Sequence, residues 1–437
     1  MLTEKFISGL SAKVAEAMTE TVRHQVGRCL LDYLGCVLAG RDSLKSNHKD
    51  VESALDLEHP ADRALALGFA SHVLELDDGH RKGAIHVGGT VFSTLAAFAD
   101  KLTNEDFVRG VVLGYEATIR LACAIQPGHK RRGFHATGTC GTVGAAIGAA
   151  SALGYTPEQI RTTIAAAVTS AAGVLEMQED GSDLKPLNVG RAAMDAVAAV
   201  RLGRLALRAP LDPLGGRRGF LAVMTDRHDE RPLVDFSGTC KILEVYMKSY
   251  AACRHAHPAI EAALALRGSV GDCAKIKAVM VETYDLAVSG HDSKSIGSVS
   301  EAKMSMPFGV SLALILGGAG VEAYCEENVR RPEISELMKK ISIMGTPEFS
   351  SQVPARRAAR LTIEMEDGHQ LSKQVDYPKG EPENPLSDDE LWAKFVGLVA
   401  VSGMSKTEAL SVSQGVLAGD FDALKSFSCG KLFGRFV

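Results

Sequence analysis

The chain has few aromatic residues and no long hydrophobic run. Aromatic side chains make up 5% of its 437 residues, with a single Trp. The apolar stretch at residues 310–321 is shorter than the roughly 18 residues that a membrane-spanning helix needs. The N-terminus contains acidic residues and lacks both a basic start and a small-residue cleavage site. We therefore expect a cytoplasmic protein without a membrane partner.

The sequence also has no CxxC pair and no basic block. Its nine cysteines are scattered and odd in number, which argues against a disulfide framework or a thiolate zinc site. Lys and Arg total 48 against 53 Asp and Glu, giving a formal net charge of −5. We expect no nucleic-acid partner, because no Lys/Arg cluster is interleaved with aromatic residues.

Small residues at helical spacing dominate residues 1 to about 260, for example at 141–153. Such spacing predicts closely packed helices rather than a phosphate-binding loop, because no GKS or GKT triplet follows the glycines. Thr156 and Ser387 have the features of helix N-caps.

The pattern changes near residue 275, where apolar and polar residues alternate over 275–284. Residues 361–366 and 370–375 flank Asp367-Gly368, which predicts a hairpin, and 341–344 suit another strand. Helices are expected at 302–324 and 334–340. Residues of about 270 to 380 thus form an α+β insertion in a mainly helical chain.

The first candidate site is the stretch from His72 to Gly89, which is rich in acids and histidines. It contains Glu75, Asp77, Asp78, His80 and His86. The adjacent aspartates cannot share one helix face, so one would brace the backbone while the other faces a pocket. A solvated capping turn and a metal site are the alternatives, although no HExxH motif is present.

Two further polar groups precede helical segments. His135 comes just before a Thr/Gly run, where Thr137 and free helix N–H groups could receive a carboxylate. Lys185, followed by Pro186, lies in a loop between apolar helices and could bind a carboxylate or move a proton. The alternatives are a structural histidine and a surface lysine.

A third cluster, residues 248–257, is basic. It contains Lys248, Cys253, Arg254, His255 and His257, just before a helix that begins at Pro258. These groups match a di- or tricarboxylate better than a neutral ligand. A solvated basic turn is the alternative, and a Cys–His nucleophile pair is a further one.

Taken together, the motifs resemble those of the MmgE/PrpD family. They occur in the family's order: ELDDGH (75–80), IHVGG (85–89), GFHATGTCGTVGAA (133–146), LKPLNVGRAA (184–193), YAACRHAHPAIEAAL (250–264) and EAKMSMPFGVSLAL (301–314). The resemblance implies a mainly α fold: a large all-helical domain formed by both chain ends (residues 1–268 and 385–437), with an inserted smaller α+β lid domain (269–384). It also implies a homodimer and a site that needs no cofactor and no metal.

The resemblance assigns roles to residues as well. It implies that His135, Lys185, His86, Asp77 and Asp78 line the pocket, and our hypothesis is that these five residues are catalytic. The substrate-binding residues that we expect beside them are Glu75, His80, Thr137, Lys248, Cys253, Arg254, His257 and Phe308. The chain departs from the decarboxylase pattern at Glu75, Gly79, Cys253 and Phe308, and the loss of a phenol at 308 argues against decarboxylation.

These features predict an acid/base enzyme that acts α to a carboxylate of a small polycarboxylate. Dehydration, as in 2-methylcitrate dehydratase, is the first candidate reaction. Epimerisation, as in iminodisuccinate epimerase, ranks nearly equal to it. Decarboxylation, as in cis-aconitate decarboxylase, comes next. Two other classes stay open: a metallohydrolase that uses Asp77, Asp78, His80 and His86, and a non-catalytic binding dimer.

Overall fold

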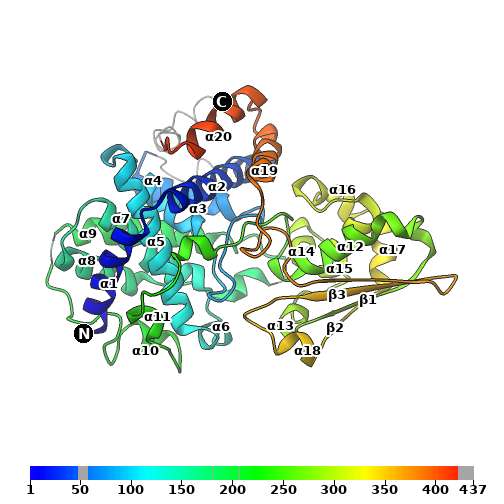
Figure 1. The fold of residues 1–437 in the computed structure, drawn as a ribbon, viewed down its shortest axis with the longest axis horizontal. Helices are drawn as coiled ribbons and strands as arrows, with labels where there is room; N and C mark the ends of the chain where they lie inside the picture. Colours follow the sequence, from blue (N-terminus) through cyan, green and yellow to red (C-terminus); the bar gives the residue numbers. More distant parts are fainter. Residues whose placement is uncertain (48–57, 180, 206, 422–437) are drawn as a thin grey trace.

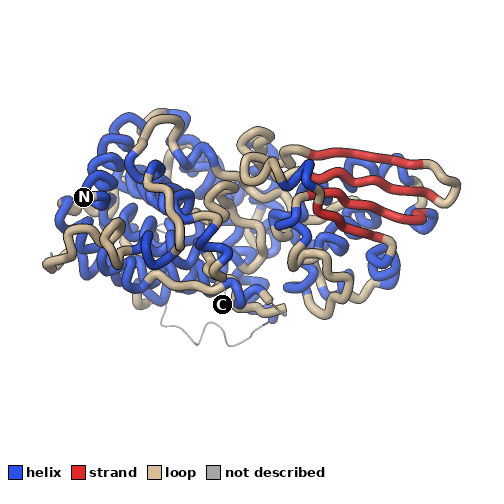
Figure 2. The backbone as a smooth tube through the Cα atoms, turned by 90° about the horizontal axis from the view of Figure 1, so that it is seen from below, coloured by secondary structure: helices blue, strands red, loops and turns tan. Residues whose placement is uncertain are grey.

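The computed structural model describes residues 1–47, 58–179, 181–205 and 207–421. A helical body occupies one end of an elongated molecule, and a smaller part that contains the only sheet seen in the described residues occupies the other (Figures 1 and 2). The last helices return to the body, where they lie beside its first long helix (Figure 1).

The body is built from helices of both ends of the chain. Its elements are α1 (Leu2–Ala17), α2 (Glu20–Asn47), α3 (Pro60–His72), α4 (Gly88–Ala96), η2 (Ala99–Lys101), α5 (Asn104–Ile125), α6 (Gly128–Arg131), α7 (Ala136–Ala152), α8 (Pro157–Ser170), η3 (Leu175–Gln178), α9 (Leu187–Gly203), α10 (Phe220–Met224), α11 (Arg231–Val234), η4 (Lys241–Glu244), α19 (Asp388–Val401) and α20 (Lys406–Leu417).

Helix α7 lies at the centre of the body, against α4, α5, α8 and α9. Its glycines permit this packing, because a Cβ on Gly148 would lie 2.5 Å from the carbonyl oxygen of Gly110 and 2.8 Å from the Cα of Gly114, both on α5. The small-residue pattern therefore serves close helix packing, as predicted. The predicted N-caps are also confirmed, since Thr156 and Ser387 each form a capping box.

Helix α19 connects the C-terminal segment to the first candidate motif. It packs on α2, and the Lys394 amine donates to the carbonyl oxygen of Leu76 (2.9 Å) and to the carboxylate of Asp32. A residue near the end of the chain thus fixes the backbone between Glu75 and Asp77.

The α+β part combines short helices with four strands. Its elements are η5 (Arg254–Ala256), α12 (His257–Val270), η6 (Cys273–Lys275), β1 (Ile276–Thr283), α13 (Asp285–Val288), α14 (Val299–Met304), α15 (Met306–Leu316), η7 (Val321–Ala323), α16 (Glu326–Val329), α17 (Pro332–Lys339), β2 (Ile341–Gly345), α18 (Pro347–Ser350), β3 (Ala359–Met365) and β4 (Gln370–Val375).

The sheet has the order β2-β1-β3-β4, with β1 and β2 parallel and the other pairs antiparallel. The predicted strands and the hairpin are confirmed, and Gly368 adopts the positive φ of 84° that its turn requires. The helix expected at 302–324 is instead divided. Ser305 caps α15 through the Phe308 N–H, and α15 ends at Gly317 in the left-handed region.

The predicted fold class is wrong in two respects. The body is not all-helical, because extended segments form isolated β-bridges such as the one between Gly79 and Tyr246. The α+β part is also not a lid with a core of its own, since its buried cluster includes Cys36 of α2, Leu76, and Leu398 of α19. The structure supports a mainly helical chain with a small α+β part. The domain boundaries at 268/269 and 384/385 stay a prediction.

Among the described helices, none combines the length and apolar character that crossing a bilayer demands.

The α5–α7 contact gives a stability prediction. Gly148→Ala places a methyl group against backbone atoms of α5, so we expect about 1–3 kcal/mol of destabilisation, measured by urea denaturation. Gly268→Ala is the matched control, because Gly268 lies on an exposed turn of α12 and no heavy atom lies within 4 Å of the place that the new methyl group would take. The control should gain up to about 1 kcal/mol. Equal stability of the two variants would contradict the close packing.

Candidate active site

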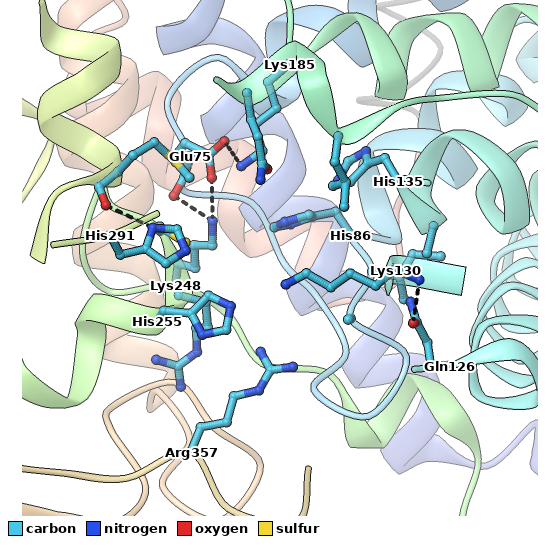
Figure 3. A pocket seen from close by; sticks show the side chains of 18 of the residues that line it. Glu75, His86, Gln126, Lys130, His135, Lys185, Lys248, His255, His291 and Arg357 are labelled. Carbon is cyan, nitrogen blue, oxygen red and sulfur yellow. Dashed lines mark hydrogen bonds and ion pairs between the residues drawn. The ribbon is translucent and has the colours of Figure 1, made fainter. Parts of the chain in front are cut away.

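A pocket opens where the helical body meets the α+β part, and both contribute its walls (Figure 3). The lining residues are Glu75, Ala84, Ile85, His86, Gln126, Lys130, Phe134, His135, Ala136, Leu175, Gln178, Lys185, Tyr246, Lys248, Cys253, Arg254, His255, His291, Met304 and Arg357. Five of these side chains are cationic and one is acidic, so the lining favours an anionic ligand.

Glu75 is the acidic residue, and two lysines neutralise it. The Lys185 amine donates to Oε1, while the Lys248 amine lies 3.2 Å from Oε2 and donates to the Glu75 carbonyl oxygen at 2.9 Å. Burial alone would raise the pKa of Glu75, but Lys185 and Lys248 hold it well below its usual value. Glu75 is therefore an anion that orders two ammonium groups at the pocket wall.

The backbone of this wall is strained. Glu75 and Ala84, the non-glycine residues with positive φ in the described chain, have φ of 53° and 47°, and both line the pocket. Each such residue costs of order 1 kcal/mol or more and persists only where its surroundings fix it. At Glu75, the hydrogen bonds from Lys248 to its carbonyl oxygen and from Lys394 to that of Leu76 supply this constraint.

Three imidazoles lie close together beside Glu75. The ring centroids of His72 and His86 are 4.5 Å apart, and His135 lies 6.4 and 6.5 Å from them. Asp77 accepts hydrogen bonds from His72 Nδ1 at 2.9 Å and lies 3.3 Å from His86 Nδ1. His86 Nδ1 also donates to the Asp78 carbonyl oxygen at 2.9 Å, which leaves Nε2 for a ligand.

His135 is the residue just before α7, as expected, and it lines the same pocket as Lys185. Burial and then the Lys185 charge lower its pKa well below the usual value, so the ring is neutral. Its buried Nδ1 has no hydrogen-bond partner among the described residues. Thr137, in the first turn of α7, accepts from the His86 N–H at 3.1 Å and so joins the first two motifs.

Asp78 and His80 face away from this group of imidazoles. Asp78 accepts from the N–H of Gly88 (2.8 Å) and the phenol of Tyr115 (2.6 Å), and it braces the start of α4. Burial raises the Asp78 pKa to about 6. The His80 Nε2 lies 3.4 Å from a carboxylate oxygen of Glu244. Neither residue is part of the pocket lining.

The opposite wall presents cations with unused donors. Arg254 is 5% exposed and donates to Glu381, yet its Nε and Nη1 lack partners in the described chain. Arg357 donates to the Arg81 carbonyl oxygen at 2.7 Å, and its Nε is likewise unpartnered there. Buried donors of this kind are expected to bind a ligand. Figure 3 shows Arg357 and Lys130 directed toward the labelled imidazoles.

Four predicted binding residues lie outside the lining: His80 and Thr137, described above, and His257 and Phe308. His257 begins α12, and its Nε2 interacts with the Ala252 carbonyl oxygen at 3.2 Å. Phe308 is 1% exposed on α15, with its ring 5.8 Å from that of Tyr324. The ring of Phe308 is therefore not part of the pocket lining.

The sequence motifs missed Lys130, Tyr246, His291 and Arg357. Lys130 belongs to a basic run at 129–132, directly before the motif that contains His135, and Arg357 belongs to an Arg pair just before β3. Basic runs near loops were therefore the available signal for these two. His291 and Tyr246 stand in unremarkable loops, and only packing brings them to the pocket.

Within the described part of the chain, two residue sets could hold a metal ion: His72, Asp77 and His86, and Cys253, His255 and His291. Their nitrogen, oxygen and sulfur donors are of the types that Zn²⁺ accepts. The four residues of the metallohydrolase alternative do not converge, because Asp78 and His80 have the other partners described above.

Models of known families match most of the chain. The MmgE/PrpD N-terminal domain matches residues 59–232, and the MmgE/PrpD C-terminal domain matches residues 250–416. The chain belongs to the MmgE/PrpD family. The family resemblance of the six motifs is thereby confirmed.

Relatives of this family member include enzymes named cis-aconitate decarboxylase. The human protein is 24% identical over 423 residues, which cover 90% of this chain and 87% of that protein. The protein of Aspergillus terreus is 23% identical over 350 residues, 74% of this chain and 71% of its own. The mouse protein is 25% identical over 353 residues, 77% and 71% respectively.

One of the positions where the chain departs from the decarboxylase pattern, Gly79, contacts the pocket residue Tyr246. Gly79 exchanges backbone hydrogen bonds with Tyr246, and a Cβ on residue 79 would lie 2.5 Å from the Tyr246 hydroxyl. Glycine thus leaves room for a phenol at the pocket wall. Burial raises the pKa of Tyr246, so this phenol is protonated at neutral pH.

Glu75→Gln should destabilise the protein by roughly 3 kcal/mol at pH 7, because it leaves two buried ammonium groups without their counter-charge. The folded-state pKa of Glu75 is lowered, so its contribution is complete above about pH 4.5 and is lost as pH falls through the lowered value. The difference from the wild type should therefore shrink in acid. Urea denaturation at pH 7 and in steps below pH 4.5 measures it.

The matched control is Glu176→Gln, at an exposed position, which should change stability by less than about 0.5 kcal/mol. A Glu75→Gln effect as small as the control's, or one that grows in acid, would contradict the ion-pair network.

Proposed function

We propose that this protein is a lyase that binds a small di- or tricarboxylate and moves a proton at the carbon α to one of its carboxylates, without a cofactor. The observation that carries the proposal is the pocket itself, in which unpaired arginine donors face neutral imidazoles and a lysine pair. The carboxylate-related names of the relatives support the same class of substrate.

The two walls of the pocket suggest two separate roles, substrate binding and proton transfer. Arg254, Arg357 and Lys130 would bind the substrate carboxylates, since guanidinium groups pair with carboxylates in a bidentate geometry. These cationic side chains would also stabilise the enolate-like negative charge that develops when a proton or a carboxylate leaves the α carbon.

Proton transfer would fall to His135 and His86. A neutral His135 with an unpartnered Nδ1 can accept a proton, and His86, oriented through Nδ1 by Asp77 and the Asp78 carbonyl, can supply or accept the second one at Nε2. Lys185 is paired with Glu75 and lowers the basicity of His135. Asp77 acts as a positioning residue.

The leaving group decides which lyase this is. Loss of hydroxide makes a dehydratase, and loss of CO₂ makes a decarboxylase. The relatives favour decarboxylation, and the argument against it from Phe308 is weakened because Phe308 is not a lining residue. The phenol of Tyr246 offers a proton donor for either product. Return of the proton to the other face would make an epimerase. The homodimer and the cytoplasmic location stay predictions.

Incubation with cis-aconitate, citrate and 2-methylcitrate in D₂O, followed by NMR, tests the reaction. We expect loss of CO₂ or of water from one of these acids. Loss of CO₂ should leave solvent deuterium on the product carbon that is reprotonated, whereas loss of water removes the α proton and adds no deuterium to the product. His135→Asn should lower kcat by about 10²–10⁴, because one positioned acid/base group contributes that much. His228→Asn, a control on an exposed surface loop, should leave kcat unchanged. Deuterium exchange without loss of a group would show an epimerase, and unaltered acids would contradict the proposal.

Arg357 and its neighbour Arg356 form a matched pair for substrate binding. Arg357→Gln should raise KM by about tenfold to hundredfold, because it removes a charged donor from the pocket. Arg356 stacks on Tyr377 and pairs with Asp376 at the surface, so Arg356→Gln should leave KM unchanged. Steady-state kinetics measure both. An unchanged KM in Arg357→Gln would remove Arg357 from the carboxylate site.

A further inference from the structure

Cys253 lies at the pocket wall, at one of the positions where the chain departs from the decarboxylase pattern. Its Sγ is 3.7 Å from Nε2 of His291, and the ring of His291 is fixed because its Nδ1 donates to the Met304 carbonyl oxygen at 3.0 Å. The N–H of Cys253 donates to the Lys303 carbonyl oxygen at 2.8 Å, which fixes the backbone of the thiol. Both partners of this contact are therefore held in place.

The electrostatics of the pair differ from those of the Cys123 thiol. Burial raises the pKa of the Cys253 thiol, but the His291 charge outweighs it and lowers the pKa to about 5. Burial lowers the pKa of His291, but the charge of Cys253 raises it by more, so the pKa of His291 lies above its usual value. In contrast, burial raises the pKa of Cys123 to about 11.

The surroundings of Cys253 attract anions. The next residue, Arg254, is buried with Nε and Nη1 unpartnered among the described residues, and Lys130, Lys185 and Arg357 line the same pocket. This excess of positive charge disfavours a metal cation on Cys253, His255 and His291, although their donor atoms lie within 4.8 Å of one another. The same charge raises the local concentration of small carboxylates.

We propose that the sulfur of Cys253, held 3.7 Å from Nε2 of His291 and next to the Arg254 donors that lack partners in the described chain, is a site of covalent modification by small electrophiles that carry a carboxylate. With iodoacetate as the probe, the thiolate sulfur attacks the methylene carbon, an S–C bond forms, the C–I bond breaks and iodide leaves. His291 keeps its proton. The inference rests on the carboxylate-binding part of the proposed function and not on the lyase chemistry.

Alkylation of the full-length native protein, read by peptide mass spectrometry, tests the proposal. At pH 6, iodoacetate should label Cys253 at least tenfold faster than the partly buried Cys123, Cys273 and Cys325, because the gain in thiolate fraction exceeds the loss of intrinsic nucleophilicity. Iodoacetate should also outpace the neutral iodoacetamide at Cys253 alone, since a thiolate outside a cationic pocket repels the carboxylate. Excess citrate should slow this labelling.

His291→Asn supplies the second arm. It should lower the labelling of Cys253 at pH 6 at least tenfold while the preference for iodoacetate over iodoacetamide persists. Cys253 that reacts no faster than the other three cysteines, or that shows no preference for iodoacetate, would overturn the proposal. So would labelling that appears only after a chelator is added, because the cluster would then hold a metal. Iodoacetate selectivity without turnover of any acid would refute the lyase reaction alone, whereas turnover with an unreactive Cys253 would refute this inference alone.

Discussion

The pocket depends on one buried carboxylate and the two ammonium groups that it pairs with. Glu75 lies on a strained loop of the helical body, Lys185 comes from the turn before α9, and Lys248 comes from the segment that leads to the α+β part. A buried charge without its partner costs several kcal/mol, so these three segments can be buried only together. The network therefore fixes the position of both walls of the pocket relative to each other.

The distribution of charge then determines what the pocket can bind. Glu75 neutralises lysines on one side, while the arginines on the other side keep donors without partners. Between them, burial lowers the pKa values of His135 and His86, so both rings are neutral and can accept a proton. The polyacid proposed as substrate would pair with the arginines and bring its α carbon near the imidazoles.

Local patterns predicted much of this fold but less of the site. The Asp-Gly hairpin and the capping residues Thr156 and Ser387 depend on short-range rules, and the structure confirms them. The motifs also indicated that His135 and Lys185 share a pocket. Arg357 and His291 reach it only through packing of the α+β part, which leaves no local pattern. The prediction of a separate lid domain was wrong for a related reason. Residues of α2 and α19 complete the core of the α+β part, and such long-range contacts leave no periodic pattern in the sequence.

The contact between Lys394 and Leu76 has a consequence for biosynthesis. The two residues are 318 positions apart, and the lysine belongs to the penultimate helix of the described chain. A nascent polypeptide on the ribosome has therefore made the acidic loop long before the residue that braces its carbonyl emerges from the exit tunnel. The hydrogen bond that fixes this loop can form only after α19 has been synthesised, and a chain truncated before α19 lacks it.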